Sequence, residues 1–191
     1  MDGASPFGPA TLAAPVVIVP GLGGSGEGHW QTLWERAHPR AIRIRPASWD
    51  APDVQDWIAA VDRSVRAHAE PPLIVAHSLG TIATMAWALD HPGRARAALL
   101  VAPPDAARPG APPVIRAFAA VQPAPLRMPV AVVASENDPY AGLDHSREVA
   151  RRLGCEPIVP GALGHLNADS SLGEWSEGAA LLEHLARASA A

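Results

Sequence analysis

Ser78 lies in the pentapeptide Ala-His-Ser-Leu-Gly, residues 76–80, where an apolar run gives way to a helical pattern. The pentapeptide matches the nucleophile elbow Gly-x-Ser-x-Gly, with Ala76 in place of the first glycine. Small residues are needed on both sides of such a serine because the tight turn presses the backbone against its neighbours. A serine here has two interpretations. It either caps the helix that follows or exposes its hydroxyl as a nucleophile.

A carboxylate and an imidazole follow in the chain order of an α/β-hydrolase triad, which is Ser, Asp, His. Asp138 comes just after the apolar run at 129–135, and His165 follows the run at 155–160. Because parallel strands bring their carboxyl ends to one edge of a sheet, we expect Ser78, Asp138 and His165 to meet there. Ser78 would then attack an activated carbonyl, His165 would take its proton, and Asp138 would fix the imidazole tautomer.

The acid and the base also have purely structural interpretations. Asn-Asp-Pro is a common turn sequence, so Asp138 is also consistent with a turn residue, which would leave Glu136 or Asp144 as the acid. His165 is also consistent with an ordinary loop histidine. His77 adjoins Ser78, but neighbouring residues of an extended segment point to opposite sides, so we expect His77 to be structural.

The glycine-rich loop at 20–30 is expected to approach the substrate. The tetrahedral oxyanion needs two backbone N–H groups, one from Leu79 after the nucleophile and one from this loop, where position favours Leu22. Gly21 and Gly23 would let the loop come close to a substrate. Trp30 is the tryptophan nearest the loop, which makes it our candidate for the pocket wall, whereas Trp49, Trp87 and Trp175 are expected in the core.

The same loop offers a second interpretation as a dinucleotide site. Gly21, Gly23 and Gly26 satisfy Gly-x-Gly-x-x-Gly after a predicted strand, and Arg45 on the next strand would suit the 2′-phosphate of NADP. We favour this alternative less because it leaves the serine, aspartate and histidine unexplained. The chain has no lysine, which excludes a P-loop.

Six short apolar runs alternate with helical patterns, which is typical of a mostly parallel sheet with helices on both faces. A helix over 53–69 would be capped by Asp53, with Asp56 three residues on as in a capping box. The proline-rich segment 103–129 predicts a long loop over the carboxyl edge, with one helical turn at 114–120. We predict strands at 15–20, 41–46, 72–77, 97–102, 129–135 and 155–160, and further helices at 29–37, 79–91, 143–153 and 174–188.

The amino-acid composition limits the classes of protein to which this chain can belong. With 191 residues, 48% hydrophobic and 18% charged, we expect one globular domain over 15–191 after a disordered leader at 1–14. The net charge is −4 and the 15 basic residues, all arginine, are mostly dispersed, which argues against nucleic acid as a partner. The single cysteine, Cys155, excludes an internal disulfide and a thiolate-rich zinc site. We expect a cytoplasmic protein with no cofactor, metal or membrane association.

Four stretches together resemble one family: VVIVPGLGGSGEGHWQTLWE, AHSLG, SENDPY and GHLNADSSLGEW. They are similar to the small serine hydrolases grouped with retinoblastoma-binding protein 9 and the bacterial YdeN proteins, over nearly all of the chain after the leader. The resemblance implies a compact α/β-hydrolase that lacks the first two strands of the larger fold. It also implies a strand order of 2-1-3-4-5-6 and a triad of Ser78, Asp138 and His165. Ala76, where the family more often has glycine, and the proline-rich segment depart from the pattern.

These observations predict a serine hydrolase that cleaves a small ester, thioester or amide through an acyl-enzyme. The main alternative is a protein-interaction module that keeps the fold without the chemistry. An intact set of nucleophile, base and acid favours the enzyme, because an interaction module has no physical need for all three at one sheet edge.

Overall fold

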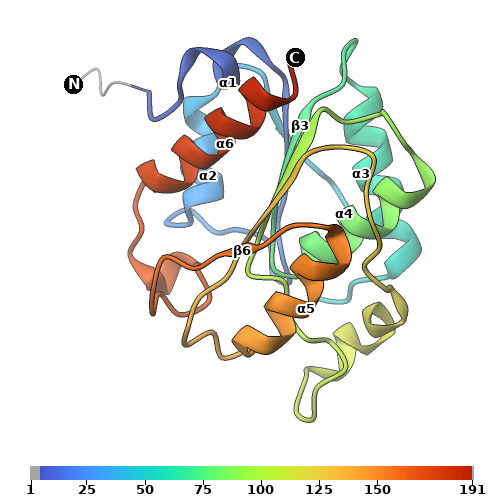
Figure 1. The fold of residues 1–191 in the computed structure, drawn as a ribbon. Helices are drawn as coiled ribbons and strands as arrows, with labels where there is room; N and C mark the ends of the chain where they lie inside the picture. Colours follow the sequence, from blue (N-terminus) through green and yellow to red (C-terminus); the bar gives the residue numbers. More distant parts are fainter. Residues whose placement is uncertain (1–4, 191) are drawn as a thin grey trace.

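One six-stranded sheet organises the chain (Figure 1). The computed structural model describes residues 5–190. All neighbouring strands run parallel, and their order, β2-β1-β3-β4-β5-β6, is the predicted one. Every strand lies inside a predicted apolar run. The strands are β1 (Val16–Val19), β2 (Ala41–Arg43), β3 (Leu73–His77), β4 (Ala97–Val101), β5 (Val130–Val133) and β6 (Pro157–Ile158).

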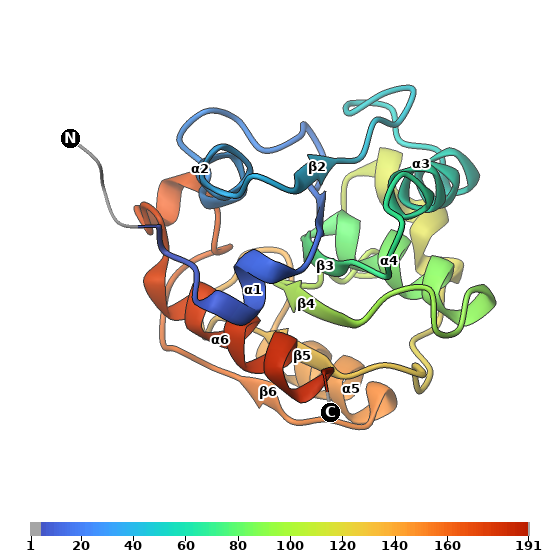
Figure 2. The same ribbon diagram turned by 90° about the horizontal axis from the view of Figure 1, so that it is seen from above.

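Helices cover both faces of the sheet, which explains why its central strands are apolar at every position except His77. Successive residues of a strand point to opposite faces. In β1, Val17 and Val19 join the core beneath α3, α4 and α5, while Val16 and Ile18 join the core beneath α1, α2 and α6 (Figure 2). These helices are α1 (Pro9–Ala13), α2 (Trp30–Ala37), α3 (Val54–Arg66), α4 (Leu79–Asp90), α5 (Leu143–Leu153) and α6 (Ser176–Ala188).

The five predicted helices are present, with ends within three residues of their expected positions. Asp53 caps α3 as expected, since its Oδ1 accepts a hydrogen bond from the Asp56 N–H at 2.9 Å. The reciprocal half of a capping box does not form, because the Asp56 carboxylate accepts instead from the N–H of Ala47 at 2.7 Å. No helix within residues 5–190 is both long and apolar enough to cross a bilayer.

The expected disordered leader is wrong over its described part, residues 5–14. They contain the short helix α1 (Pro9–Ala13), and Phe7 and Thr11 are buried. Glu183 of α6 accepts hydrogen bonds from the N–H of Ala10 at 3.2 Å and from the N–H of Thr11 at 2.8 Å, so a distant carboxylate supplies the helix cap. Residues 1–4, the rest of the predicted leader, lie outside the described residues.

The proline-rich segment reaches the carboxyl edge of the sheet, as predicted, where Pro104, Pro112 and Ile115 border the same cavity as Ser78. Its helical turn is a 3-10 helix, η1 (Pro113–Ala120), which places Ile115 and Phe118 in the buried core. A second 3-10 helix, η2 (Ala168–Ser170), follows the loop after β6.

Candidate active site

Ser78 occupies a strained turn between β3 and α4. Its φ of 52° and ψ of −127° are unusual for a residue with a side chain. The helix-cap interpretation is wrong, because the Ser78 side chain makes no capping hydrogen bond to α4. The turn also explains the small residue after it. A Cβ on Gly80 would lie 2.4 Å from the carbonyl oxygens of Val19 and Pro20.

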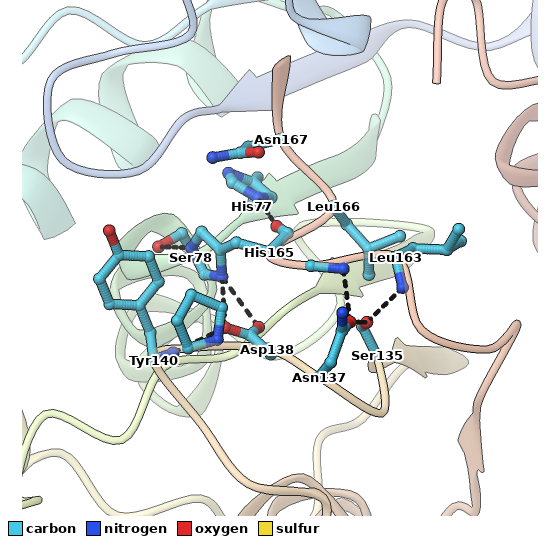
Figure 3. A network of polar contacts seen from close by, with 12 residues as sticks. His77, Ser78, Ser135, Asn137, Asp138, Tyr140, Leu163, His165, Leu166 and Asn167 are labelled. Atoms are coloured by element: carbon cyan, nitrogen blue, oxygen red, sulfur yellow. Dashed lines mark hydrogen bonds and ion pairs between the residues drawn. The ribbon is translucent and has the colours of Figure 1, made fainter. Parts of the chain in front are cut away.

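Three predicted side chains meet at this edge of the sheet (Figure 3). The Nε2 of His165 lies 2.8 Å from the Oγ of Ser78. The Nδ1 of His165 lies 2.9 and 2.8 Å from the two carboxylate oxygens of Asp138. Because an ionised carboxylate only accepts, Nδ1 carries the ring proton and Nε2 is free to accept from the Ser78 hydroxyl. The side chains of His165 and Asp138 are only 7% and 3% exposed.

Asp138 also keeps the turn role that its sequence predicted. Its Oδ1 accepts from the N–H of Tyr140 at 2.8 Å, and the Tyr140 ring lies edge-on to His165 with ring centroids 4.5 Å apart (Figure 3). The two substitute acids do not take its place. Glu136 is exposed, and Asp144 points to solvent, where it pairs with Arg147.

Two buried histidines lie beside His165. The Nε2 of His77 donates to the carbonyl oxygen of His165 at 2.9 Å, so His77 contacts the backbone of His165 and not the Ser78 hydroxyl. Burial lowers the pKa of His77 well below its usual value, with smaller effects from His165 and His29. Burial, together with Arg43 and His165, lowers the pKa of His29 to about 4. Both rings are therefore neutral near pH 7.

The predicted oxyanion donors both border the cavity at Ser78. Leu79 is the first residue of α4, so its N–H has no partner within the helix. Among the hydrogen bonds of residues 5–190, none is donated by the N–H of Leu22. Gly21 lets this loop approach Ser78, because a Cβ there would lie 2.7 Å from the Cβ of Ser78. That close approach accounts for Gly21 without a dinucleotide.

A cavity of about 300 Å³ opens beside the serine. The glycine loop lines one side, and the proline-rich segment lines another. The lining residues are Gly21, Leu22, Gly24, Ser25, Gly26, His29, His77, Ser78, Leu79, Pro104, Pro112, Ile115, Tyr140, His165, Asn167 and Ala168.

Two predicted pocket residues, Gly23 and Trp30, do not line this cavity. Gly23 adopts a φ of 76° in the turn and donates its N–H to the carbonyl of Trp49. Trp30 begins α2 and points into the core, where it is 1% exposed and packs against Trp34 and Trp175. Periodicity places Trp30 on a helix but does not reveal which face of that helix meets the sheet.

Sequence reasoning missed several side chains that contact the His165 loop, among them Ser135 and Asn137. Both lie just before Asp138, but no spacing rule connects them with a loop that follows the next strand. Within residues 5–190, no group of three or more His, Cys, Asp or Glu side chains could hold a metal ion.

The sequence and structure of this chain are similar to those of known proteins. The model of the family described as serine hydrolase matches residues 16–184. A YdeN-like protein from Pectobacterium atrosepticum superposes with a TM-score of 0.81 at 29% identity, covering 92% of this chain and 91% of that chain. The ydeN gene product of B. subtilis superposes with a TM-score of 0.76 at 18% identity, covering 90% of this chain and 98% of that chain.

The esterase domain of a Rhodothermus marinus protein gives a TM-score of 0.67 at 19% identity, covering 91% of this chain and 87% of that chain. A search of curated proteins gives no significant match. The family match spans most of the chain. The chain therefore belongs to the serine hydrolase family and has the α/β-hydrolase fold.

Proposed function

We propose that this hydrolase cleaves small esters through an acyl-enzyme on Ser78, with His165 as general base and Asp138 as the acid of the triad. One observation carries the proposal. The Ser78 hydroxyl, the His165 imidazole and the Asp138 carboxylate form a continuous hydrogen-bonded chain beside a cavity. A serine that only capped a helix would not bond to a buried imidazole.

The chemistry follows from the position of each proton. The Oγ of Ser78 attacks the ester carbonyl while the Nε2 of His165 takes its proton. The N–H groups of Leu22 and Leu79 would stabilise the oxyanion as it forms. His165 then gives the proton to the departing alcohol, and a water molecule, deprotonated by the same nitrogen, hydrolyses the acyl-enzyme. Asp138 stabilises the imidazolium without itself taking the proton.

The cavity favours a small, uncharged substrate. Its volume of about 300 Å³ is at the lower end for ligand sites. Leu79, Pro104, Pro112 and Ile115 form an apolar wall, and among residues 5–190 no arginine, aspartate or glutamate lines the cavity. A charged acyl group would therefore lose its hydration without gaining a counter-ion, which is costly.

The test compares two p-nitrophenyl esters with the same leaving group, the butyrate and the hemisuccinate. We expect Ser78-dependent hydrolysis of the butyrate, and a kcat/KM for the hemisuccinate that is lower by about 10-fold or more. Ser78→Ala should lower kcat by about 10⁴-fold or more. Hydrolysis that survives in Ser78→Ala would contradict the mechanism. Folded protein that hydrolyses neither ester, and whose serine does not react with a fluorophosphonate, would favour the interaction module.

A further inference from the structure

The loop that carries His165, residues 161–167, has no regular secondary structure. Three of its residues have a positive φ: Gly161 with 116°, Gly164 with 59° and Leu166 with 50°. Leu166 is fully buried and has a side chain, so this conformation persists only if the surroundings hold it. The base of the proposed triad therefore depends on contacts from outside its own loop.

Two side chains that follow β5 hold the loop just before His165 (Figure 3). The Oγ of Ser135 accepts from the N–H of Leu163 at 2.8 Å. The Oδ1 of Asn137 accepts from the N–H of Gly164 at 2.7 Å. The two side chains also bond to each other, with the Ser135 hydroxyl donating to the Asn137 Oδ1 at 3.0 Å.

Two further side chains hold the next two carbonyl groups. The Nε2 of His77 donates to the carbonyl of His165 at 2.9 Å, and the Nε1 of Trp30 donates to the carbonyl of Leu166 at 2.7 Å. Trp30 and His77 are 1% and 4% exposed, so both hydrogen bonds are buried. Four consecutive residues of the loop, 163–166, are thus each bonded to a side chain from another part of the chain.

We propose that Trp30, His77, Ser135 and Asn137, here called the His165 clamp, are positioning residues that fix the imidazole for proton transfer. The inference rests on the proposed function and goes beyond it, because none of the four bonds to the Ser78 hydroxyl. A displacement of about 1 Å in a reacting group lowers rates by as much as 100-fold. Losing the bond at Leu166 frees the backbone directly beside His165.

Trp34 provides a matched control for Trp30. Both lie on α2, both are almost fully buried, and their rings meet edge-on with centroids 4.8 Å apart. The Nε1 of Trp34 also donates to a backbone carbonyl, that of Glu174, at 2.6 Å. Glu174 lies beyond the His165 loop, so the Trp34 bond has only a structural role.

The test compares Trp30→Phe with Trp34→Phe in the whole protein. Each variant loses one indole N–H from the same aromatic cluster, so we expect similar decreases in the free energy of unfolding. Only Trp30→Phe should lower kcat, by about 10-fold, with KM within about 2-fold of the parent. It should also slow fluorophosphonate labelling of Ser78 by a similar factor. If Trp30→Phe does not fold, benzothienylalanine at position 30 removes the N–H while keeping the ring shape.

Equal kcat values in the two variants would overturn the clamp and leave the triad in place. A decrease that appears only in KM would also overturn it, since the clamp acts on proton transfer and not on binding. Wild-type protein that neither turns over esters nor reacts with the fluorophosphonate would overturn the proposed function, and the clamp with it.

Discussion

The nucleophile elbow and the His165 loop meet at 2.8 Å, yet the chain holds them in place by different means. Backbone packing fixes Ser78. The Gly80 backbone lies against the carbonyl groups at the end of β1, and Gly21 packs against the Ser78 side chain. Side-chain hydrogen bonds from distant parts of the chain fix His165 instead.

This difference decides what a sequence can reveal. Steric contact in a tight turn demands small residues at set distances from the serine, so the elbow appears as the motif at 76–80. The clamp on His165 sets no local spacing, because its members come from α2, β3 and the loop after β5. We therefore expect the two regions to respond differently to substitution, as described below in order of decreasing effect.

The largest effect should come from breaking the bond that joins the two regions. His165→Gln removes the proposed general base, and we expect kcat to fall by about 10⁴-fold or more. His145, which faces Asp105 at 3.8 Å, provides the control. Steady-state ester hydrolysis checks both variants, and His165→Gln with near-parental kcat would show that another base serves Ser78.

A side chain added next to the nucleophile elbow should destabilise the protein by steric overlap. Gly80→Ala places a methyl group against backbone that cannot move aside, so we expect the free energy of unfolding to fall by about 3 kcal/mol. Gly26→Ala is the matched control, because a Cβ at Gly26 meets nothing within 4 Å. Urea denaturation of both variants tests the point. Equal stability for the two would mean that packing does not constrain the elbow.

The free energy of unfolding should decrease in acid, because His29 is buried in its neutral form. The pKa of His29 is about 4 in the folded protein, against 6.5 for a free histidine, so the unfolded chain binds more protons between these values. Stability is therefore lost as pH falls from about 6.5 to about 4, with a cost of about 2 kcal/mol by pH 5. His77 adds to this loss in the same direction.

His29→Asn tests this dependence. In the parent, the Nδ1 of His29 caps α2 by accepting a hydrogen bond from the N–H of Gln31. The side-chain oxygen of asparagine can accept the same bond, so the variant removes the titrating ring and keeps the cap. The variant should lose less free energy of unfolding than the parent between pH 7 and pH 5. Parallel pH curves for parent and variant would count against a buried neutral His29.

The smallest effect should appear in substrate selection. Pro112 lines the cavity, whereas the adjacent Pro113 is exposed and does not. Pro112→Arg adds a cation to the uncharged wall and should narrow the preference for butyrate over hemisuccinate by about 5-fold, whereas Pro113→Arg should leave it unchanged. The ratio of kcat/KM values measures this. If the ratio changed equally in both variants, the arginine would be attracting the hemisuccinate from a distance and not contacting it in the cavity.

The sheet and the positions of the candidate triad were predictable because their signals are local. Each strand is an apolar run, and parallel order alone brings Ser78, Asp138 and His165 to one edge. The failures depend on contacts between distant residues. Helix α1 has five residues and is capped by Glu183 from the other end of the chain, which no periodicity reveals.

Trp30 shows the same limit within the site. Its nearness to the glycine loop in sequence predicted a place in the pocket wall, but the helix turns it into the core, where its indole reaches the carbonyl of Leu166. A contact between residues 30 and 166 leaves no trace in a single sequence. The proposed positioning role of Trp30 can therefore be inferred only from the fold.

Fluorophosphonate labelling followed by peptide mapping tests the central claim most directly, since the reagent reacts only with an activated serine. We predict that Ser78 alone is modified and that labelling is lost in His165→Gln. Labelling at another serine, or equal labelling of Ser78 with and without the imidazole, would contradict the account.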